Sequence, residues 1–340
     1  MPDRATELSV FVAQNGWGNA SRRPLAGDAS ARRYERLHDA ELGAAVLMDA
    51  DPSKGEEVVP FLNIAQYLSS IGLSAPRILA QDIARGFLIL EDFGDALFAR
   101  YAPAQPDQEE TLYAAAIDAL IALHQHAPPK DIKPYRAVMP ALAALPYDWY
   151  LPGATGQENP AGREELIALM AALLDSLASG PEVLILRDYH AENLLWLPDR
   201  SGAARVGLLD FQDAMLGHPA YDLISLVEDA RRDTSPALQE AMIARYIKTS
   251  GQNDADFRAA AAIIGAQRNL RILGVFARLT MRDGKAHYID FIPRVWGHLM
   301  HDLSHPALAQ LREIVLRDLP EPRPEILASL KAKCAKIPTP

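Results

Sequence analysis

The first quarter of the chain alternates short apolar runs with turn residues and contains one stretch with helical spacing. Residues 23–26 and 33–38 flank Gly27-Asp-Ala-Ser30, and glycine with aspartate between two such runs is typical of the tip of a β-hairpin. Apolar side chains recur at every third or fourth position across residues 58–71, which predicts an amphipathic helix. Further strands are predicted at residues 44–48, 78–80 and 86–90. This pattern favours a mainly antiparallel sheet with one helix.

The remainder of the chain is rich in Ala and Leu and has mostly helical spacing. Residues 128–160 carry repeated prolines and are expected to form a connection between helices. Helices are predicted at residues 107–125, 163–178, 222–231, 237–249, 254–281 and 306–316. Short strands are predicted at residues 183–186, 194–197 and 206–209, with a turn at 199–202 joining the last two. A second, mainly helical lobe is therefore expected.

Length and composition are those of a globular protein with two domains or two lobes. The chain has 340 residues, against roughly 150 per domain, and its 49% apolar and 23% charged residues exclude disordered or collagen-like classes. The net charge is 34 − 44 = −10, which disfavours a broad nucleic-acid surface but leaves room for a local anion site. The one cysteine, Cys334, cannot form an intramolecular disulfide, which suits a cytoplasmic protein. No apolar stretch reaches the ~20 residues of a membrane span.

The most informative chemistry lies around residues 184–213. Asp188 precedes Asn193 in the pattern D-x4-N, a strand hairpin follows, and Asp210 comes directly after an apolar strand. If the hairpin closes on itself, these three side chains surround one point. Phosphoryl transfer asks little of a protein beyond positioning and charge neutralisation. One carboxylate would orient the attacking hydroxyl, while an amide and a second carboxylate would hold Mg²⁺. D-x4-N alone is common by chance, but the two motifs together at this spacing favour a catalytic site over an ordinary acidic turn.

Four segments carry a resemblance to a known family: Gly27-Asp-Ala-Ser30, Leu-Arg-Asp-Tyr-His-Ala-Glu-Asn at 186–193, Leu-Leu-Asp-Phe-Gln-Asp-Ala at 208–214, and the run Gly-His-Pro-Ala-Tyr-Asp-Leu at 217–223. They resemble the aminoglycoside phosphotransferase/choline kinase family, a branch of the protein-kinase-like fold. Within it they are similar to the bacterial subgroup that contains the anomeric kinase of N-acetylmuramate and N-acetylglucosamine, a cell-wall recycling enzyme. The resemblance covers about residues 20–315.

The resemblance implies a bilobal α+β fold with a small, mainly antiparallel β lobe and a larger helical lobe. The implied divisions are a nucleotide-binding lobe at 1–91, a hinge at 92–95, a catalytic and acceptor lobe at 96–320, and a C-terminal helix and tail at 321–340. It also implies ATP and Mg²⁺ as cofactors and a small-molecule acceptor, most simply an amino sugar. It indicates no nucleic-acid or membrane partner, and it leaves the oligomeric state and the choice between ATP and GTP open.

Site residues are carried over by motif. Asp188 matches the catalytic aspartate, Asn193 and Asp210 match the magnesium ligands, and Asp222 matches a buried aspartate that braces the catalytic loop. His190 matches a histidine whose role is catalytic or purely structural. The residues implied at the nucleotide are Glu91 and Phe93 in the hinge, and Gly27, Asp28, Ala29 and Ser30 in a loop that covers the phosphates.

Two departures from the family pattern change this picture. Arg187 stands where the family has a glycine, and we expect it to neutralise a nearby charge at the catalytic loop. Met48 stands where a phosphate-pairing lysine is expected. Arg32, Arg33 or Arg36 on the second strand could supply that cation. Strand alternation places Arg33 on one face and the other two on the opposite face. The residues alone do not decide among the three, or against three surface arginines, and Arg33 is the one included in the predicted nucleotide site.

The acceptor site is the least constrained part of the sequence. Asp213 is expected to accept a sugar hydroxyl or to cap a turn. Arg268 and Arg271 fall within one helical turn and could clamp the carboxylate of a lactyl group, or form a solvated face. The sequence thus predicts an ATP-dependent kinase for the anomeric hydroxyl of N-acetylmuramate or N-acetylglucosamine. An aminoglycoside or other alcohol kinase, and a non-catalytic pseudokinase suggested by Met48, are the alternatives.

Overall fold

The chain divides into two compact units, each built from two separate segments. A computed structural model describes residues 3–25 and 31–336. The first unit comprises Met1–His126 with Ala191–Ala214, and the second comprises Ala127–His190 with Met215–Pro340. Parts of the chain after the expected hinge therefore pack within the first unit. The hinge at residues 92–95 stays a prediction.

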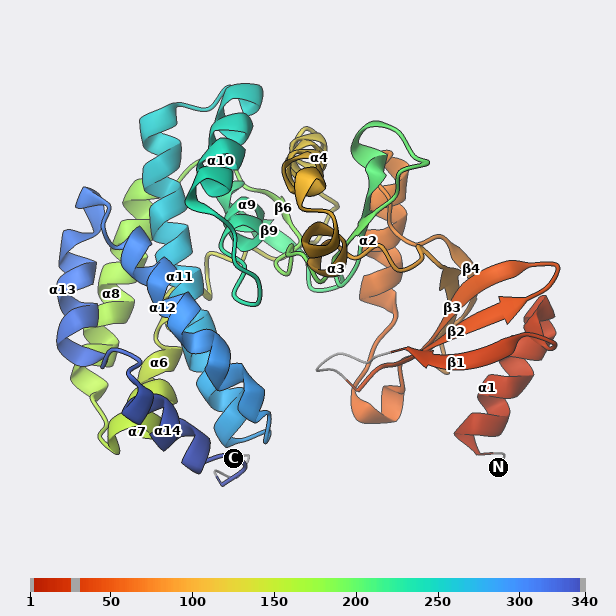
Figure 1. Ribbon diagram of the computed structural model, residues 1–340, viewed down its shortest axis with the longest axis horizontal. Helices are drawn as coiled ribbons and strands as arrows, with labels where there is room; N and C mark the ends of the chain where they lie inside the picture. Colours follow the sequence, from red (N-terminus) through yellow and green to blue (C-terminus); the bar gives the residue numbers. More distant parts are fainter. Residues whose placement is uncertain (1–2, 26–30, 337–340) are drawn as a thin grey trace. The chain divides into compact units, whose positions relative to one another are not determined.

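The first unit is built on a five-stranded, wholly antiparallel sheet in the order β1-β2-β3-β5-β4 (Figure 1). Every strand expected in this part of the chain is present. The strands are β1 (Ser21–Leu25), β2 (Arg33–Asp39), β3 (Gly43–Asp49), β4 (Ile78–Asp82) and β5 (Phe87–Glu91). The tip of the first hairpin, residues 26–30, lies outside the described residues, and with it lie the predicted phosphate-loop residues Gly27, Asp28, Ala29 and Ser30.

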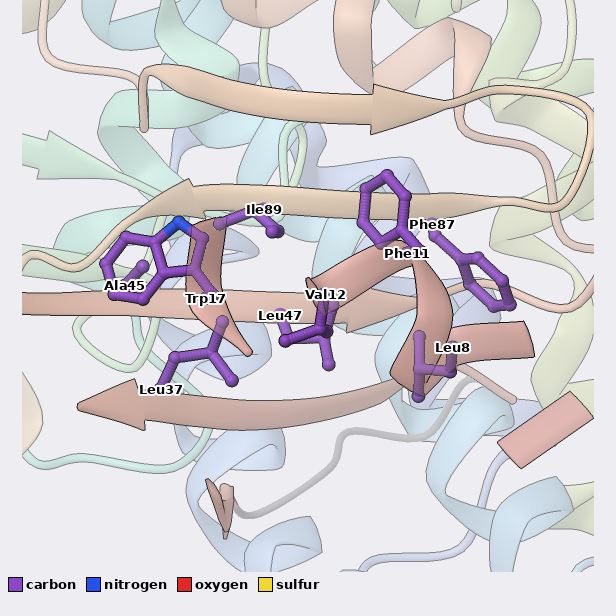
Figure 2. Close-up of a cluster of buried hydrophobic side chains, with 9 residues drawn as sticks. All are labelled: Leu8, Phe11, Val12, Trp17, Leu37, Ala45, Leu47, Phe87 and Ile89. Carbon is purple, nitrogen blue, oxygen red and sulfur yellow. The ribbon is translucent and has the colours of Figure 1, made fainter. Parts of the chain in front are cut away.

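One face of this sheet is covered by a helix that the sequence analysis missed. α1 (Arg4–Val12) begins at Asp3, whose carboxylate accepts a hydrogen bond from the Thr6 N–H at 2.8 Å. Apolar side chains of α1 and of the turn after it pack on alternate residues of three strands (Figure 2). The expectation of a single helix beside the sheet was wrong, because charged residues in the first turn of α1 mask its short apolar stripe. This buried cluster contains Leu8, Phe11, Val12, Trp17, Leu37, Ala45, Leu47, Phe87 and Ile89.

Three more helices and a second hairpin complete the first unit. α2 (Val59–Ser70) and α4 (Glu109–His124) match the predicted helices, whereas the short α3 (Phe98–Ala104) was not expected. The hairpin consists of β7 (Leu194–Trp196) and β8 (Val206–Leu208), as predicted. The ring of Phe211, just after this hairpin, stacks on Phe61 of α2 with ring centroids 5.0 Å apart. The segment after β8 is thereby anchored to α2.

The second unit is a helical assembly around α11 (Asp254–Met281), whose observed bounds match the prediction (Figure 1). Prolines at the start of α5 and α6 begin new helices rather than preventing them, so the connection at 128–160 contains three short helices. Strand β9 (Met215–Gly217), which pairs with β6 (Val183–Ile185), was also unexpected, as was α12 (Ile292–Asp302). The helices are α5 (Met139–Ala143), α6 (Leu145–Asp148), α7 (Tyr150–Thr155), α8 (Pro160–Leu177), α9 (Ala220–Val227), α10 (Pro236–Ser250), α11 (Asp254–Met281), α12 (Ile292–Asp302), α13 (Ala309–Asp318) and α14 (Pro324–Ala332). Within residues 3–25 and 31–336, no helix has the length and apolar character needed to cross a membrane.

Gly86, in the turn before β5, offers a sharp test of the sheet. Its φ is +73°, and a Cβ there would lie 1.9 Å from the Ala50 carbonyl oxygen. Gly43 has φ +82°, but a Cβ added there would meet open space, so Gly43 reports the backbone cost alone. We expect Gly43→Ala to lower the free energy of unfolding by about 1–2 kcal/mol. Gly86→Ala should cost about 1–3 kcal/mol more, from overpacking. Urea unfolding of both variants measures this, and equal losses would contradict the close approach.

Candidate active site

The loop that carries Asp188 is held from below by Asp222, in the first turn of α9. The Leu186 N–H donates to Asp222 Oδ2 at 2.5 Å, and the Arg187 N–H donates to Oδ1 at 2.9 Å. Asp222 is fully buried, and burial raises its pKa to about 7 although both hydrogen bonds act to lower it. The bracing role that the resemblance implied for Asp222 is confirmed by these contacts. The loop that leads into Asp188 is therefore pinned to a buried helix.

Arg187 adopts a backbone conformation that is uncommon for a side-chain-bearing residue. Its φ is +71°, and its guanidinium carbon lies 5.2 Å from the centre of the Tyr135 ring. Its carbonyl accepts a hydrogen bond from the Ser225 hydroxyl at 3.5 Å. A non-glycine residue with positive φ persists only where its surroundings fix it, and such residues cluster at functional sites. The positive φ of Arg187 sets the direction of the backbone at Asp188, the next residue.

His190 is a buried residue with a neutral ring at physiological pH. It is 5% exposed, and burial lowers its pKa to about 4, with Asp229 opposing this effect. Its Nε2 lies 3.3 Å from Arg231 Nη1, and Arg231 follows Asp229, whose Oδ1 accepts the Arg231 N–H at 2.8 Å. A buried ring with a lowered pKa suits packing of the loop that carries Asp188 better than proton transfer. Of the two roles implied for His190, the structure favours the structural one.

Asn193 and Asp210 come together in the first unit. The Leu209 N–H donates to the Asn193 carbonyl at 3.0 Å, and Asn193 Nδ2 lies 3.4 Å from Asp210 Oδ2. Asp210 has φ +57°, and its Oδ1 accepts a hydrogen bond from Gln212 Nε2 at 2.7 Å. The sequence analysis did not single out Gln212, which orients the Asp210 carboxylate. Only its position two residues downstream could have indicated this role.

The donors at this point suit a hard cation. Carboxylate and amide oxygens are typical Mg²⁺ ligands, and Mg²⁺ usually takes one or two protein groups together with phosphate oxygens and waters. Across the described ranges 3–25 and 31–336, no group of three or more His, Cys, Asp and Glu side chains forms a ready-made metal site. Asn193 with Asp210 offers one amide oxygen and one carboxylate, which are ligand types that suit such a cation.

The segment predicted as the hinge is fixed by arginines within the first unit. Arg36 pairs with Asp92 at 2.6 Å, and Arg200 pairs with Glu91 at 2.7 Å while its guanidinium carbon lies 5.0 Å from the Phe93 ring centre. The Phe93 ring also fills the space beside Gly207, where a Cβ would approach it to 2.8 Å. The Glu91 side chain is thus occupied by ion pairs, which leaves backbone groups of this segment as the candidates for recognising an adenine edge.

The predicted acceptor residues differ in their surroundings. Asp213 is exposed, as an acceptor-binding residue would need to be. Arg268 is only 4% exposed, and its Nη2 donates to the Ser225 hydroxyl at 2.8 Å, so it supports α9 from inside the core. Arg271 is half-buried, with Nη1 3.5 Å from the Tyr221 hydroxyl. Burial removes Arg268 from the acceptor site proposed below.

His218, just before α9, should make stability depend on pH. Its Nδ1 accepts the Ala220 N–H at 3.1 Å, and burial followed by the charge of Arg136 lowers its pKa to about 4. The pKa of His218 in the folded protein lies below its unfolded value of about 6.5, so the unfolded chain takes up the proton first as the pH falls. The contribution of His218 to the free energy of unfolding is therefore complete above pH 6.5 and is lost as the pH falls towards 4. His218→Asn keeps an acceptor without a titrating ring. Between pH 6.5 and 4, wild type should lose up to about 1.4 kcal/mol per pH unit more than the variant in urea unfolding. If the two pH profiles ran parallel, the pKa of His218 would be the same in the folded and the unfolded protein, which would contradict this prediction.

The fold and these motifs together define a class of protein. The structure is similar to a choline/ethanolamine kinase family protein from Mesorhizobium loti, with a TM-score of 0.61 and 16% identity over 97% of this chain and 100% of the other. It is also similar to an aminoglycoside phosphotransferase from Streptomyces rimosus solved with ADP and streptomycin, with a TM-score of 0.52 and 19% identity over 80% and 99% of the two chains. The predicted bilobal α+β, protein-kinase-like fold is confirmed.

The family follows from a direct match. Residues 21–263 match the model of the phosphotransferase enzyme family, and the chain belongs to that family. It is 40% identical to the N-acetylmuramate/N-acetylglucosamine kinase of Caulobacter vibrioides, over 91% of this chain and 95% of the relative. It is 34% identical to the protein of the same name from Pseudomonas aeruginosa, over 92% and 93% of the two chains. The family resemblance inferred from the motifs is confirmed.

Proposed function

We propose that this protein is an ATP-dependent kinase of N-acetylated amino sugars. The observation that carries the proposal is the similarity to kinases named for N-acetylmuramate and N-acetylglucosamine, which extends over more than nine-tenths of the chain. The residues needed for phosphoryl transfer stand at the matching motif positions, with Asp188 in a braced loop and Asn193 beside Asp210.

Asp188 is the group that accepts the proton of the attacking hydroxyl. Its loop is fixed by Asp222, so the carboxylate needs little reorganisation before the reaction. Asn193 and Asp210 would hold Mg²⁺, which would supply neutralisation of phosphate charge. Gln212 keeps the Asp210 carboxylate in one orientation through its 2.7 Å hydrogen bond. Asp213, which is exposed, and Arg271, which is half-buried, are the predicted residues that keep accessible surface for an acceptor.

The acceptor atom we propose is the anomeric hydroxyl. It is more acidic than an ordinary alcohol, so a carboxylate of modest basicity such as Asp188 suffices to accept its proton. Such a kinase would serve cell-wall recycling, as the motif resemblance implies, and the single Cys334 suits a cytoplasmic protein. An aminoglycoside or choline-like acceptor is the alternative within the same family, because solved members with 16–19% identity share only the fold.

A panel of acceptors separates these possibilities. Purified protein with Mg-ATP is given N-acetylmuramate, N-acetylglucosamine, glucose, choline or streptomycin, and ADP release is followed for each. We expect turnover with the two N-acetylated sugars and little with the others. Turnover confined to choline or streptomycin would assign the protein to the alternative. Binding of ATP with no turnover on any acceptor would favour a non-catalytic regulator.

A further inference from the structure

The structure distinguishes the three arginines that could replace the lysine missing at Met48. Met48 is uncharged and fully buried in β3, so this position supplies no cation for a ligand. An acidic chain of net charge −10 that binds a polyphosphate needs a local cation to offset phosphate charge. Arg32, Arg33 and Arg36 each contact a different acidic partner within the first unit. Those partners indicate which arginine is placed to serve a nucleotide.

Arg33 lies on the face of the sheet opposite Met48, because it pairs with Asp49, the next residue of β3. It shares a face with Leu37, and Figure 2 shows Leu37 among the side chains packed against α1. Arg33 Nη2 donates to Asp49 Oδ2 at 2.7 Å, and Asp49 also binds Arg4 of α1. Arg33 therefore helps attach α1 to the sheet. The inclusion of Arg33 in the nucleotide site is not supported by this position.

Arg36 lies on the opposite face, as expected from alternation, but it is engaged by the segment after β5. Its Nε and Nη1 pair with Asp92 at 2.6 Å and Asp95 at 2.9 Å, and its Nη2 donates to the Gly94 carbonyl at 3.2 Å. Through these contacts with two carboxylates and a carbonyl, the Arg36 guanidinium fixes residues 92–95. The two carboxylates offset its positive charge, so an added phosphate gains little from it.

Arg32 is the remaining candidate for the cation that the missing lysine would supply. It immediately precedes β2, on the face opposite Arg33, and its side chain is 9% exposed. Its Nε donates to Glu56 Oε2 at 2.8 Å, and the Ala31 N–H donates to the other Glu56 oxygen at 3.0 Å. Glu56 thereby fixes both the guanidinium and the backbone directly after residues 26–30. In the sequence, Ala31 and Arg32 directly follow residues 27–30, the predicted phosphate-covering loop.

We infer that Arg32, oriented by Glu56, is the phosphate-binding cation of this protein. The inference rests on the proposed function for the presence of a nucleotide. An acidic partner does not prevent the role: a guanidinium has five N–H donors, and in protein kinases the phosphate-pairing lysine is itself ion-paired to a glutamate. Arginine binds phosphate through two parallel hydrogen bonds, so a partner that fixes its plane also fixes the direction of phosphate approach. Glu56 is a positioning residue, and Arg32 contacts the ligand.

The test compares ATP with adenosine, which lacks phosphates, by calorimetry on the full chain. Arg32→Ala should weaken ATP binding by about tenfold or more and change adenosine binding by less than about twofold, because one charge-assisted bond to phosphate is lost. Glu56→Gln should shift ATP binding in the same direction by a smaller factor, and Arg32→Lys should retain part of the affinity. Arg22→Ala is the matched control, since Arg22 is ion-paired to Glu35 in the same sheet at 2.7 Å.

The outcomes separate this inference from the proposed function. Equal losses of ATP and adenosine affinity in Arg32→Ala would show a structural role and overturn the inference. Unchanged ATP affinity in Arg32→Ala, or a loss in Arg33→Ala instead, would also overturn it while the sugar-kinase proposal stands. Wild-type protein that binds ATP through Arg32 but turns over no N-acetylated sugar would support the inference and contradict the proposed acceptor. Wild-type protein that binds no ATP would overturn both.

Discussion

Replacing Asp188 by asparagine is expected to lower kcat by about 10²–10⁴ while ATP binding survives. That range is what a positioned general base contributes. Asparagine has nearly the same shape, so the loop fixed by Asp222 through the Leu186 and Arg187 N–H groups should keep its conformation. What is lost is the negative oxygen that accepts the proton of the acceptor hydroxyl. The measurement is steady-state ADP release with a confirmed sugar acceptor, together with ATP binding by calorimetry.

A matched control for this variant is Asp199→Asn, which removes an exposed carboxylate from the turn between β7 and β8. It should leave kcat within about twofold of wild type, because substitutions of exposed residues outside the core and the site have little effect on the folded structure. If Asp188→Asn retained more than about half of the wild-type kcat, the proton acceptor would have to be another group. Loss of ATP binding as well would mean that the loop itself had collapsed.

Replacing Asp210 by asparagine is expected to remove most of the Mg²⁺ dependence of ATP binding. Asparagine tolerates the left-handed conformation at this position, φ +57°, whereas alanine would add backbone strain to the loss of the carboxylate. Loss of an outer-shell partner alone costs roughly 10–100-fold in metal affinity, and loss of a charged ligand should cost at least as much. Calorimetric titration of ATP at a series of Mg²⁺ concentrations measures the effect.

Gln212→Leu provides a graded comparison, since it removes the 2.7 Å hydrogen bond to Asp210 but leaves the carboxylate in place. It should raise the Mg²⁺ requirement by less than Asp210→Asn does. An Asp210→Asn protein with the Mg²⁺ dependence of wild type would place the metal ligand elsewhere in the chain.

The sequence predicted well those elements whose signal is local. The hairpin of β1 and β2, the amphipathic α2 and the long α11 each follow from periodicity within one segment. α1 was missed because its apolar stripe is short and acquires meaning only against the sheet. The short helices α5, α6 and α7 were missed because prolines at or near their first turns can equally indicate a break between helices.

The site divides along the same line. Asp188, Asn193 and Asp210 could be predicted as site residues because they belong to motifs whose spacing is fixed by one loop and one hairpin. The ion-pair partners of Arg32 and Arg36 are distant in the sequence, for example Glu56 and Asp92. Strand alternation alone could therefore separate Arg33 from the other two arginines but could not identify the phosphate-binding one. Burial of Arg268 likewise depends on how α9 packs against α11. A helical wheel cannot show whether a shared face meets solvent or another helix.

The central claim is that the γ-phosphoryl group of ATP moves to the anomeric hydroxyl of an N-acetylated amino sugar. A reducing sugar equilibrates with its open-chain aldehyde only while that hydroxyl is free, so phosphorylation there removes the reducing end. The direct measurement follows ADP and reducing ends together during incubation with Mg-ATP and N-acetylmuramate or N-acetylglucosamine. We predict that one reducing end disappears for each ADP formed. ADP formation with the reducing ends intact would contradict transfer to the anomeric position.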